Sequence, residues 1–160
     1  MAELVPISRT GYTRLKEELD RLQKELTEVL QLVADAREHG DLRENAEYLS
    51  GRERQGFIVG RIGELTGALN RADIIDCTKV QSNQAVFGTV VTLLDLDTQE
   101  KVTYQLLGPD EADHDSGSIS IHSPIGLSIH GHSIGDKVSV EIPRGDRHFE
   151  VIDIVRSQVE

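Results

Sequence analysis

Two acidic residues, Asp41 and Glu44, are the most informative chemical feature of this 160-residue chain. They lie three residues apart, and arginines precede, separate and follow them. Both carboxylates are expected to be ionised at neutral pH, and no pocket or nucleophile is evident beside them, so hydrolysis by these groups alone is excluded. Mg²⁺ prefers oxygen ligands and recruits one or two carboxylates at a time. The pair is therefore suited to complete the coordination of a Mg²⁺ ion that another protein already holds.

The segment before this pair carries a coiled-coil repeat. Apolar residues recur there at spacings of three and four, namely Tyr12, Leu15, Leu19, Leu22, Leu26, Val29, Val33 and Ala36. The pattern predicts a helix from the N-cap Ser8 to His39, which would be about 48 Å long at about 1.5 Å per residue. Gly40 is expected to end this helix, because glycine tolerates the backbone conformation of a helix C-terminus.

A second and weaker repeat follows the acidic pair. Its 3,4 positions are Tyr48, Gly51, Gln55, Ile58, Ile62, Leu65, Leu69 and Ala72. Glycines at 51, 56, 60, 63 and 67 should each cost about 1 kcal/mol relative to alanine, so the leucine-rich first helix must stabilise the second. The two repeats predict an antiparallel coiled-coil hairpin over residues 1–77, with its acidic tip near 40–45. We expect the hairpin to be loosest near Gly51 and Gln55, where the repeat lacks good hydrophobic residues.

Past Ala72 the periodicity changes from helical to alternating. A polar linker is predicted at 78–84 and a second domain at 85–160, with strands near 89–94, 102–107, 138–142 and 149–155. Ser123-Pro124 predicts a short helix, with serine as N-cap and proline at the first helical position. The expected fold class is α+β: a long helical hairpin followed by a small antiparallel sheet domain with one short helix.

Other candidate sites in the second half are weaker. The acidic loop at 110–115 includes His114 but lacks the spacing of a calcium-binding EF-hand, which favours a solvated loop. His130 and His132 lack a well-spaced third zinc ligand, which favours a surface pair. Cys77 is the one cysteine, so an internal disulfide is excluded.

Bulk composition narrows the function classes. A net charge of −11 argues against a protein whose main task is to grip nucleic acid, because phosphate contacts need basic surface. No apolar run approaches the ~20 residues of a membrane span, and no signal peptide opens the chain. A cytoplasmic protein with no membrane partner is expected.

Residues 36–48 closely resemble the hairpin tip of the bacterial Gre transcript cleavage factors, the GreA type in particular. The resemblance extends along nearly the whole chain, through 55–57, 61–62, 74–76, 86–88, 110–113 and 123–125. It implies an FK506-binding-protein-like (FKBP-like) C-terminal domain and bacterial RNA polymerase as the partner, with the hairpin entering the polymerase's secondary channel. Asp41 and Glu44 match the family residues that help to hold the second Mg²⁺ of the polymerase and to orient the attacking water.

The resemblance also implies roles for the rest of the chain. The polymerase would cut the extruded 3′ end of the nascent RNA and supply the Mg²⁺, so the chain is not itself expected to be an enzyme or to bind a cofactor in isolation. Arg37, Arg43 and Arg52 are implied to steer or brace the RNA. The segment Ser123-Pro124-Ile125 is implied to take part in polymerase docking. The family commonly carries basic residues where Leu127 and His132 stand here, so we expect the docking details to differ.

Alternatives from other classes stay open at this point. One is a secondary-channel-binding inhibitor or modulator of RNA polymerase with the same architecture, against which the intact Asp41 and Glu44 count. A second is a coiled-coil adaptor whose tip acids only confer solubility. A peptidyl-prolyl isomerase role is disfavoured, because the second half has three aromatic residues of the Phe, Tyr and Trp class and no tryptophan for a lined pocket.

Overall fold

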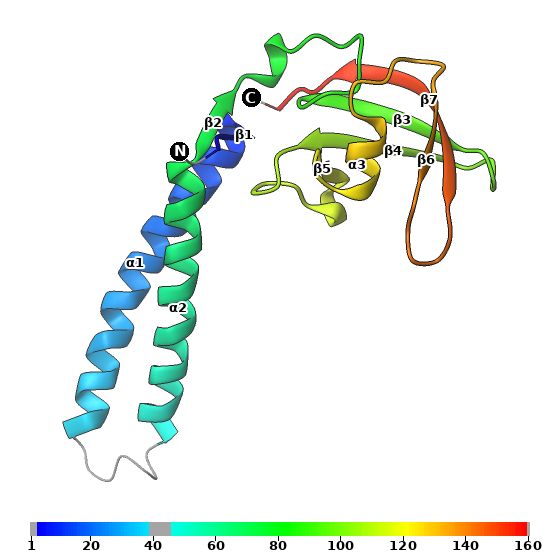
Figure 1. Ribbon diagram of the computed structural model, residues 1–160. Helices are drawn as coiled ribbons and strands as arrows, with labels where there is room; N and C mark the ends of the chain where they lie inside the picture. Colours follow the sequence, from blue (N-terminus) through cyan, green and yellow to red (C-terminus); the bar gives the residue numbers. More distant parts are fainter. Residues whose placement is uncertain (1–2, 39–45, 160) are drawn as a thin grey trace. The chain divides into compact units, whose positions relative to one another are not determined.

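A computed structural model of the chain describes residues 3–38 and 46–159 (Figure 1). The chain divides into two compact units: Thr13–Arg71, and Met1–Tyr12 together with Ala72–Glu160. The first twelve residues thus group with the C-terminal half, whereas the sequence analysis assigned them to the hairpin domain.

The unit Thr13–Arg71 is a hairpin of two long helices, α1 (Arg9–Glu38) and α2 (Ala46–Asn70). Residues on the two helices pair in reverse order, Glu18 with Arg61 and Glu25 with Arg54, so the helices are antiparallel. Most buried side chains follow the predicted repeat, namely Leu15, Leu22, Val29, Val33 and Ala36 on α1, and Ile58 and Leu65 on α2. The predicted antiparallel hairpin is confirmed for the described residues.

Two details of α2 differ from the prediction. The helix ends at Asn70, so Ala72, the last predicted repeat position, lies instead in a strand. Ala68 is buried, whereas its neighbour Leu69 is only half-buried. The physical reason for the earlier end is that the residues after Arg71 form backbone hydrogen bonds with a strand from the start of the chain.

That pairing is a small parallel sheet of β1 (Val5–Ser8) and β2 (Ala72–Ile75), in register from Val5 opposite Ala72 to Ser8 opposite Ile75. Ser8 ends β1 and immediately precedes α1, and its Oγ accepts a hydrogen bond from the Gly11 N–H at 3.0 Å. The predicted N-cap is confirmed.

The C-terminal half forms a five-stranded sheet in the order β5–β4–β3–β7–β6. Its strands are β3 (Thr89–Asp95), β4 (Lys101–Leu107), β5 (Ser118–Ser120), β6 (Lys137–Val140) and β7 (Arg147–Arg156). All neighbours are antiparallel except β4 and β5, which are parallel. The four predicted strands are confirmed, and β5 is an addition.

One short helix, α3 (Pro124–Ile129), completes this half, and Ile129 buries itself in the core beside Phe149 and Leu106. The predicted α+β fold class, a helical hairpin followed by a small sheet domain with a short helix, is confirmed. Two single-turn 3₁₀ helices, η1 (Cys77–Lys79) and η2 (His114–Ser116), lie in the connections.

Cys77 opens the connection between β2 and the five-stranded sheet, and it is fully buried against Phe87 and Leu107. Burial away from water, reinforced by the negative charges of Glu111 and Asp76, raises the pKa of the thiol to about 11. The thiol is therefore protonated at neutral pH and is not a nucleophile.

Candidate functional site

The predicted metal-binding pair lies between the two hairpin helices in the sequence. α1 ends at Glu38 and α2 begins at Ala46, and these two ends lie side by side at one end of the hairpin (Figure 1). Residues 39–45 connect them in the sequence, and Asp41, Arg43 and Glu44 fall within this segment, outside the described residues. Their roles therefore stay predictions, and the described residues define only how the segment is held.

Two of the three predicted RNA-steering arginines are described. Arg37 is exposed in the last turn of α1, where a positive charge also interacts favourably with the helix dipole. Arg52 is exposed in the second turn of α2. Both lie within two turns of the helix ends at Glu38 and Ala46, so the structure brings the two arginines to the same end of the hairpin.

The helices that carry this end are connected by two ion pairs, one heptad apart on both helices. Near the tip, Arg54 donates to Glu25 from Nε at 2.8 Å and approaches it through Nη2 at 2.5 Å. Closer to the base, Arg61 forms a fork on Glu18, with Nε and Nη2 at 2.7 and 3.1 Å from its two carboxylate oxygens. A fork of this kind constrains geometry as well as adding energy, so the pairs oppose sliding of one helix along the other.

Electrostatic shifts agree with this geometry. The hydrogen bonds from Arg61 lower the pKa of Glu18, and those to Glu18 and Glu64 raise the pKa of Arg61. Glu18 and Arg61 therefore both keep their charge near neutral pH. The Glu18–Arg61 and Glu25–Arg54 ion pairs were not predicted. The sequence does carry a signal for them, because Glu residues flank the first repeat at a spacing of seven and Arg residues flank the second at the same spacing.

The predicted docking segment has a clear local structure. Ser123 Oγ accepts a hydrogen bond from the Gly126 N–H at 3.1 Å and donates one to the Ser120 carbonyl at 2.6 Å, which confirms its N-cap role. Pro124 is exposed at the start of α3, and Ile125 is half-buried against the core. Of the three, Pro124 presents the most surface to a partner.

Two positions near this segment depart from the family pattern. Leu127 is 61% exposed on α3. His132 lies 3.1 Å from Asp136 through Nδ1, and the pKa of Asp136 is lowered, first by the Ser133 N–H and second by His132. An apolar side chain and a carboxylate-bound histidine therefore stand where positive charges were expected.

Glu111 corrects the prediction of a solvated acidic loop. Its carboxylate accepts hydrogen bonds from the Ser8 backbone N–H at 2.7 Å and from the Ser8 hydroxyl at 2.5 Å, and Ser8 itself is fully buried. Asp113 and Asp115 remain exposed as predicted. The error arose because the partner of Glu111 is 103 residues away in sequence, beyond any local pattern.

Among the side chains within 3–38 and 46–159, no group of three or more His, Cys, Asp or Glu residues is arranged to hold a metal ion. Within the same ranges, no helix has both the length and the apolar character needed to cross a bilayer.

Comparison with models of known protein families shows to which family the chain belongs. The model described as "Transcription elongation factor, N-terminal" matches residues 5–74, and "Transcription elongation factor, GreA/GreB, C-term" matches residues 80–156. The chain belongs to the GreA/GreB family of transcription elongation factors. The two matches cover the helical hairpin and the sheet domain in turn, so the family relationship applies to both halves.

Individual members of the GreA/GreB family agree with this assignment. The chain is 52% identical to the transcription elongation factor GreA of Desulfotalea psychrophila over 155 residues, 96% of each chain. It is 46% identical to the GreA of Trichlorobacter lovleyi, covering 96% of this chain and 98% of the relative. The assignment does not rest on the solved structures, among which GreA factor homolog 1 of Thermus thermophilus is 29% identical, with a TM-score of 0.46 over 96% of this chain and 99% of that one.

Proposed function

We propose that this chain enters the secondary channel of a bacterial RNA polymerase and stimulates the polymerase's own cleavage of backtracked RNA, which rescues arrested complexes in the cytoplasm. The observation that carries the proposal is the GreA/GreB family match over both halves of the chain, together with an acidic pair between the two hairpin helices in the sequence. The catalytic machinery belongs to the polymerase, and the chain is its accessory factor.

The hairpin supports this role by its length and stiffness. α1 has 30 residues, which corresponds to about 45 Å at about 1.5 Å per residue. A helix pair of this length can carry side chains deep into another enzyme. The Arg54–Glu25 and Arg61–Glu18 pairs hold its two helices in register. Exposed Arg37 and Arg52 would offer positive charge to the phosphates of the extruded RNA.

Asp41 and Glu44 would supply carboxylate oxygens to the polymerase's Mg²⁺, whose chemistry when bound is to activate water and stabilise the leaving oxygen. Their donor set fits such sharing, because two carboxylates leave most of the six positions of an octahedral Mg²⁺ site to other ligands. The chain's own contribution is then to position these two side chains and to neutralise nearby phosphate charge through its arginines.

Cleavage of stalled, backtracked elongation complexes tests the proposal. Purified chain should shorten the RNA from its 3′ end. Asp41→Asn or Glu44→Gln should reduce the stimulated rate by about 100-fold or more, the scale on which removal of one transition-state-stabilising group acts. Affinity for the polymerase should change little, because the substituted side chains keep their size.

Glu38→Gln is the matched control, since Glu38 is an exposed carboxylate in the last residue of α1, beside the acidic pair in sequence. It should leave cleavage within about twofold of the wild type, because the proposal gives Glu38 no role as a Mg²⁺ ligand and an exposed charge without such a role has a small effect. Equal cleavage by wild type and by the Asp41→Asn/Glu44→Gln double variant would refute the role of the pair. Inhibition of polymerase without any cleavage would favour the channel-binding modulator.

A further inference from the structure

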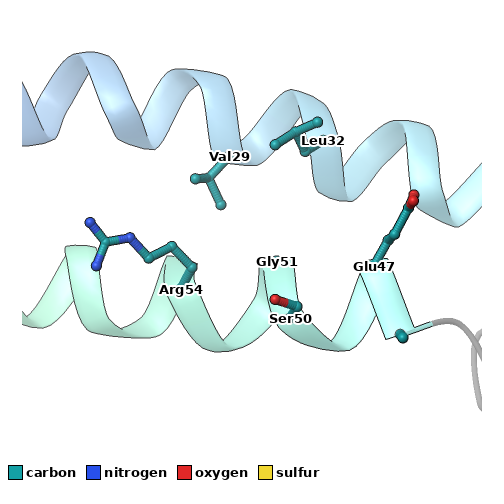
Figure 2. A pocket seen from close by; sticks show the side chains of 7 residues that line it. Val29, Leu32, Glu47, Ser50, Gly51 and Arg54 are labelled. Atoms are coloured by element: carbon teal, nitrogen blue, oxygen red, sulfur yellow. The ribbon is translucent and has the colours of Figure 1, made fainter.

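An open groove lies between the two helices close to the tip end of the hairpin (Figure 2). Val29 and Leu32 line it from α1, and Glu47, Gly51 and Arg54 line it from α2. Its volume is 560 Å³, enough to receive large side chains of another molecule. The residues that line it come from both helices, so the groove exists only while the hairpin is closed.

The groove forms because the second repeat has a glycine where an apolar side chain is expected. Gly51 lacks a side chain, and a Cβ built on it would lie 2.9 Å from Cγ2 of Val33, so the Val33 side chain packs directly against the Gly51 backbone. The space beside Gly51 is left unfilled, and Leu32, which lies next to it, remains 64% exposed. An exposed apolar side chain at the rim of an unfilled groove is a typical feature of a binding surface.

The charges around the groove define what it can bind. Arg54 is held by Glu25 at 2.5 Å and lies over the ring of Phe57 at 5.1 Å, so its charge is already compensated. Glu47 lines the groove, and Glu28 and Asp35 lie four residues before and three after Leu32, on the same face of α1. Apart from Arg54, which is paired with Glu25, the charged side chains named here are acidic, and they flank an apolar surface.

We propose that this groove binds a segment of the partner polymerase that presents an apolar side chain beside lysine or arginine. The apolar side chain would fill the groove against Val29 and Leu32, beside the Gly51 backbone, and the basic side chain would meet Glu47. An RNA strand is disfavoured, because its phosphates would face an acidic rim. A second copy of the chain is disfavoured for the same reason, since it carries the same acidic groups and a net charge of −11. The inference rests on the proposed function, because it requires the hairpin to lie within the polymerase.

Binding measurements with matched surface variants test the proposal. Leu32→Gln should weaken the affinity of the full chain for core polymerase about fivefold or more, the scale of an anchor side chain at an interface. Leu49→Gln is the control, because Leu49 is 55% exposed on α2 and does not line the groove. It should change the affinity by less than about twofold, as expected for a peripheral position. Both substitutions are at exposed sites, and circular dichroism should show unchanged helix content.

The charge on the rim is tested separately. Glu47→Gln should weaken binding and make it less sensitive to salt, whereas Glu53→Gln, also exposed on α2 but outside the groove, should do neither. Equal effects of Leu32→Gln and Leu49→Gln would overturn the inference.

Four further outcomes are informative. Weakening by Leu32→Gln that appears only in backtracked complexes, and not with core polymerase, would identify RNA as the occupant and overturn the inference. A change in the sedimentation of the free chain would identify a second copy and overturn it as well. Absence of binding by the wild-type chain would overturn the proposed function itself, whereas wild-type binding that Leu32→Gln leaves unchanged overturns the groove proposal alone.

Discussion

The Arg61 side chain donates three hydrogen bonds to the carboxylates of two glutamates. It donates two hydrogen bonds to Glu18 across the hairpin and one to Glu64 on its own helix at 3.0 Å. The guanidinium and the Glu18 carboxylate are each about a third exposed, at 36% and 27%, so water screens much of their attraction. The pair is therefore expected to contribute more to the register of the two helices than to the free energy of unfolding.

The pH dependence of stability should reveal this pair. Because the pKa of Glu18 is lower in the folded protein, ionised Glu18 stabilises the folded hairpin at pH values above the ordinary glutamate pKa of 4.5. This stabilisation is lost as the pH falls through the lower pKa of the folded state. Glu18→Gln should lower the free energy of unfolding by up to about 1 kcal/mol at pH 7, after allowance for screening. Urea titrations at pH 7 and pH 3 measure the difference, which should shrink at pH 3. A constant difference at both values would mean that the charge of Glu18 is not what stabilises the hairpin.

At the scale of elements, the stability of the hairpin depends on the α1 side of the coiled-coil repeat. Leu22 is 6% exposed in the middle of α1. Leu22→Ala should reduce the free energy of unfolding by about 2–5 kcal/mol, because it removes buried methyl groups and leaves a cavity. Leu30→Ala, at a 45% exposed position on the same helix, should cost much less. Chemical denaturation followed by circular dichroism measures both, and similar losses would mean that the buried face of α1 is misassigned.

The glycines of α2 should respond differently to the same substitution. A Cβ at Gly63 would meet no atom within 4 Å, so Gly63→Ala should stabilise the helix by about 0.5–1 kcal/mol through its higher helix propensity. A Cβ at Gly51 would approach Val33 to 2.9 Å, so Gly51→Ala should gain less or destabilise. Urea midpoints of the two variants decide this, and equal gains would show that the helices separate freely near the groove.

Elements with a local signal could be predicted from the sequence. The repeat of α1 and the Ser123-Pro124 start of α3 are confirmed because both depend on spacing along one segment. The parallel pairing of β1 with β2 joins segments 67 residues apart, Val5 with Ala72, and short apolar stretches do not reveal their partners. The gap in the second repeat at Gly51 indicated poor packing near the groove. A repeat position without an apolar side chain, however, predicts loose helix packing as readily as a binding surface.

For the candidate site too, the sequence predicted the features with a local signal and not the contacts between distant segments. Asp41 and Glu44 were identified by residue type, by their place between two repeats and by resemblance, and their geometry stays a prediction. The ion pairs that support the site link Glu18 to Arg61 and Glu25 to Arg54 across the hairpin. Such pairs can be named only after the alignment of the two helices is known, because each residue has several charged candidates within one turn.

At the scale of the whole molecule, α1 is the element that belongs to both compact units. Its residues up to Tyr12 group with the sheet-containing half, and those from Thr13 onward form the hairpin with α2. The start of α1 is fixed by Glu111, which accepts hydrogen bonds from the buried backbone N–H and hydroxyl of Ser8. A Cβ on Gly11 would collide with the Glu111 carboxylate, so this contact also requires a glycine in the first turn.

Glu111→Ala should therefore loosen the first turn of α1 without touching the acidic pair. Two buried donors on Ser8 would lose their acceptors, and each unsatisfied buried polar group costs about 1–3 kcal/mol. Amide hydrogen exchange should accelerate at residues 9–12, whereas protection around Leu22 should persist because the coiled-coil contacts there are unchanged. Asp115→Ala, at an exposed carboxylate of the same loop, is the control and should leave both regions protected. If the two variants exchange alike, the start of the hairpin is held by β1–β2 pairing alone, and Glu111 is a surface acid that happens to lie near a helix N-terminus.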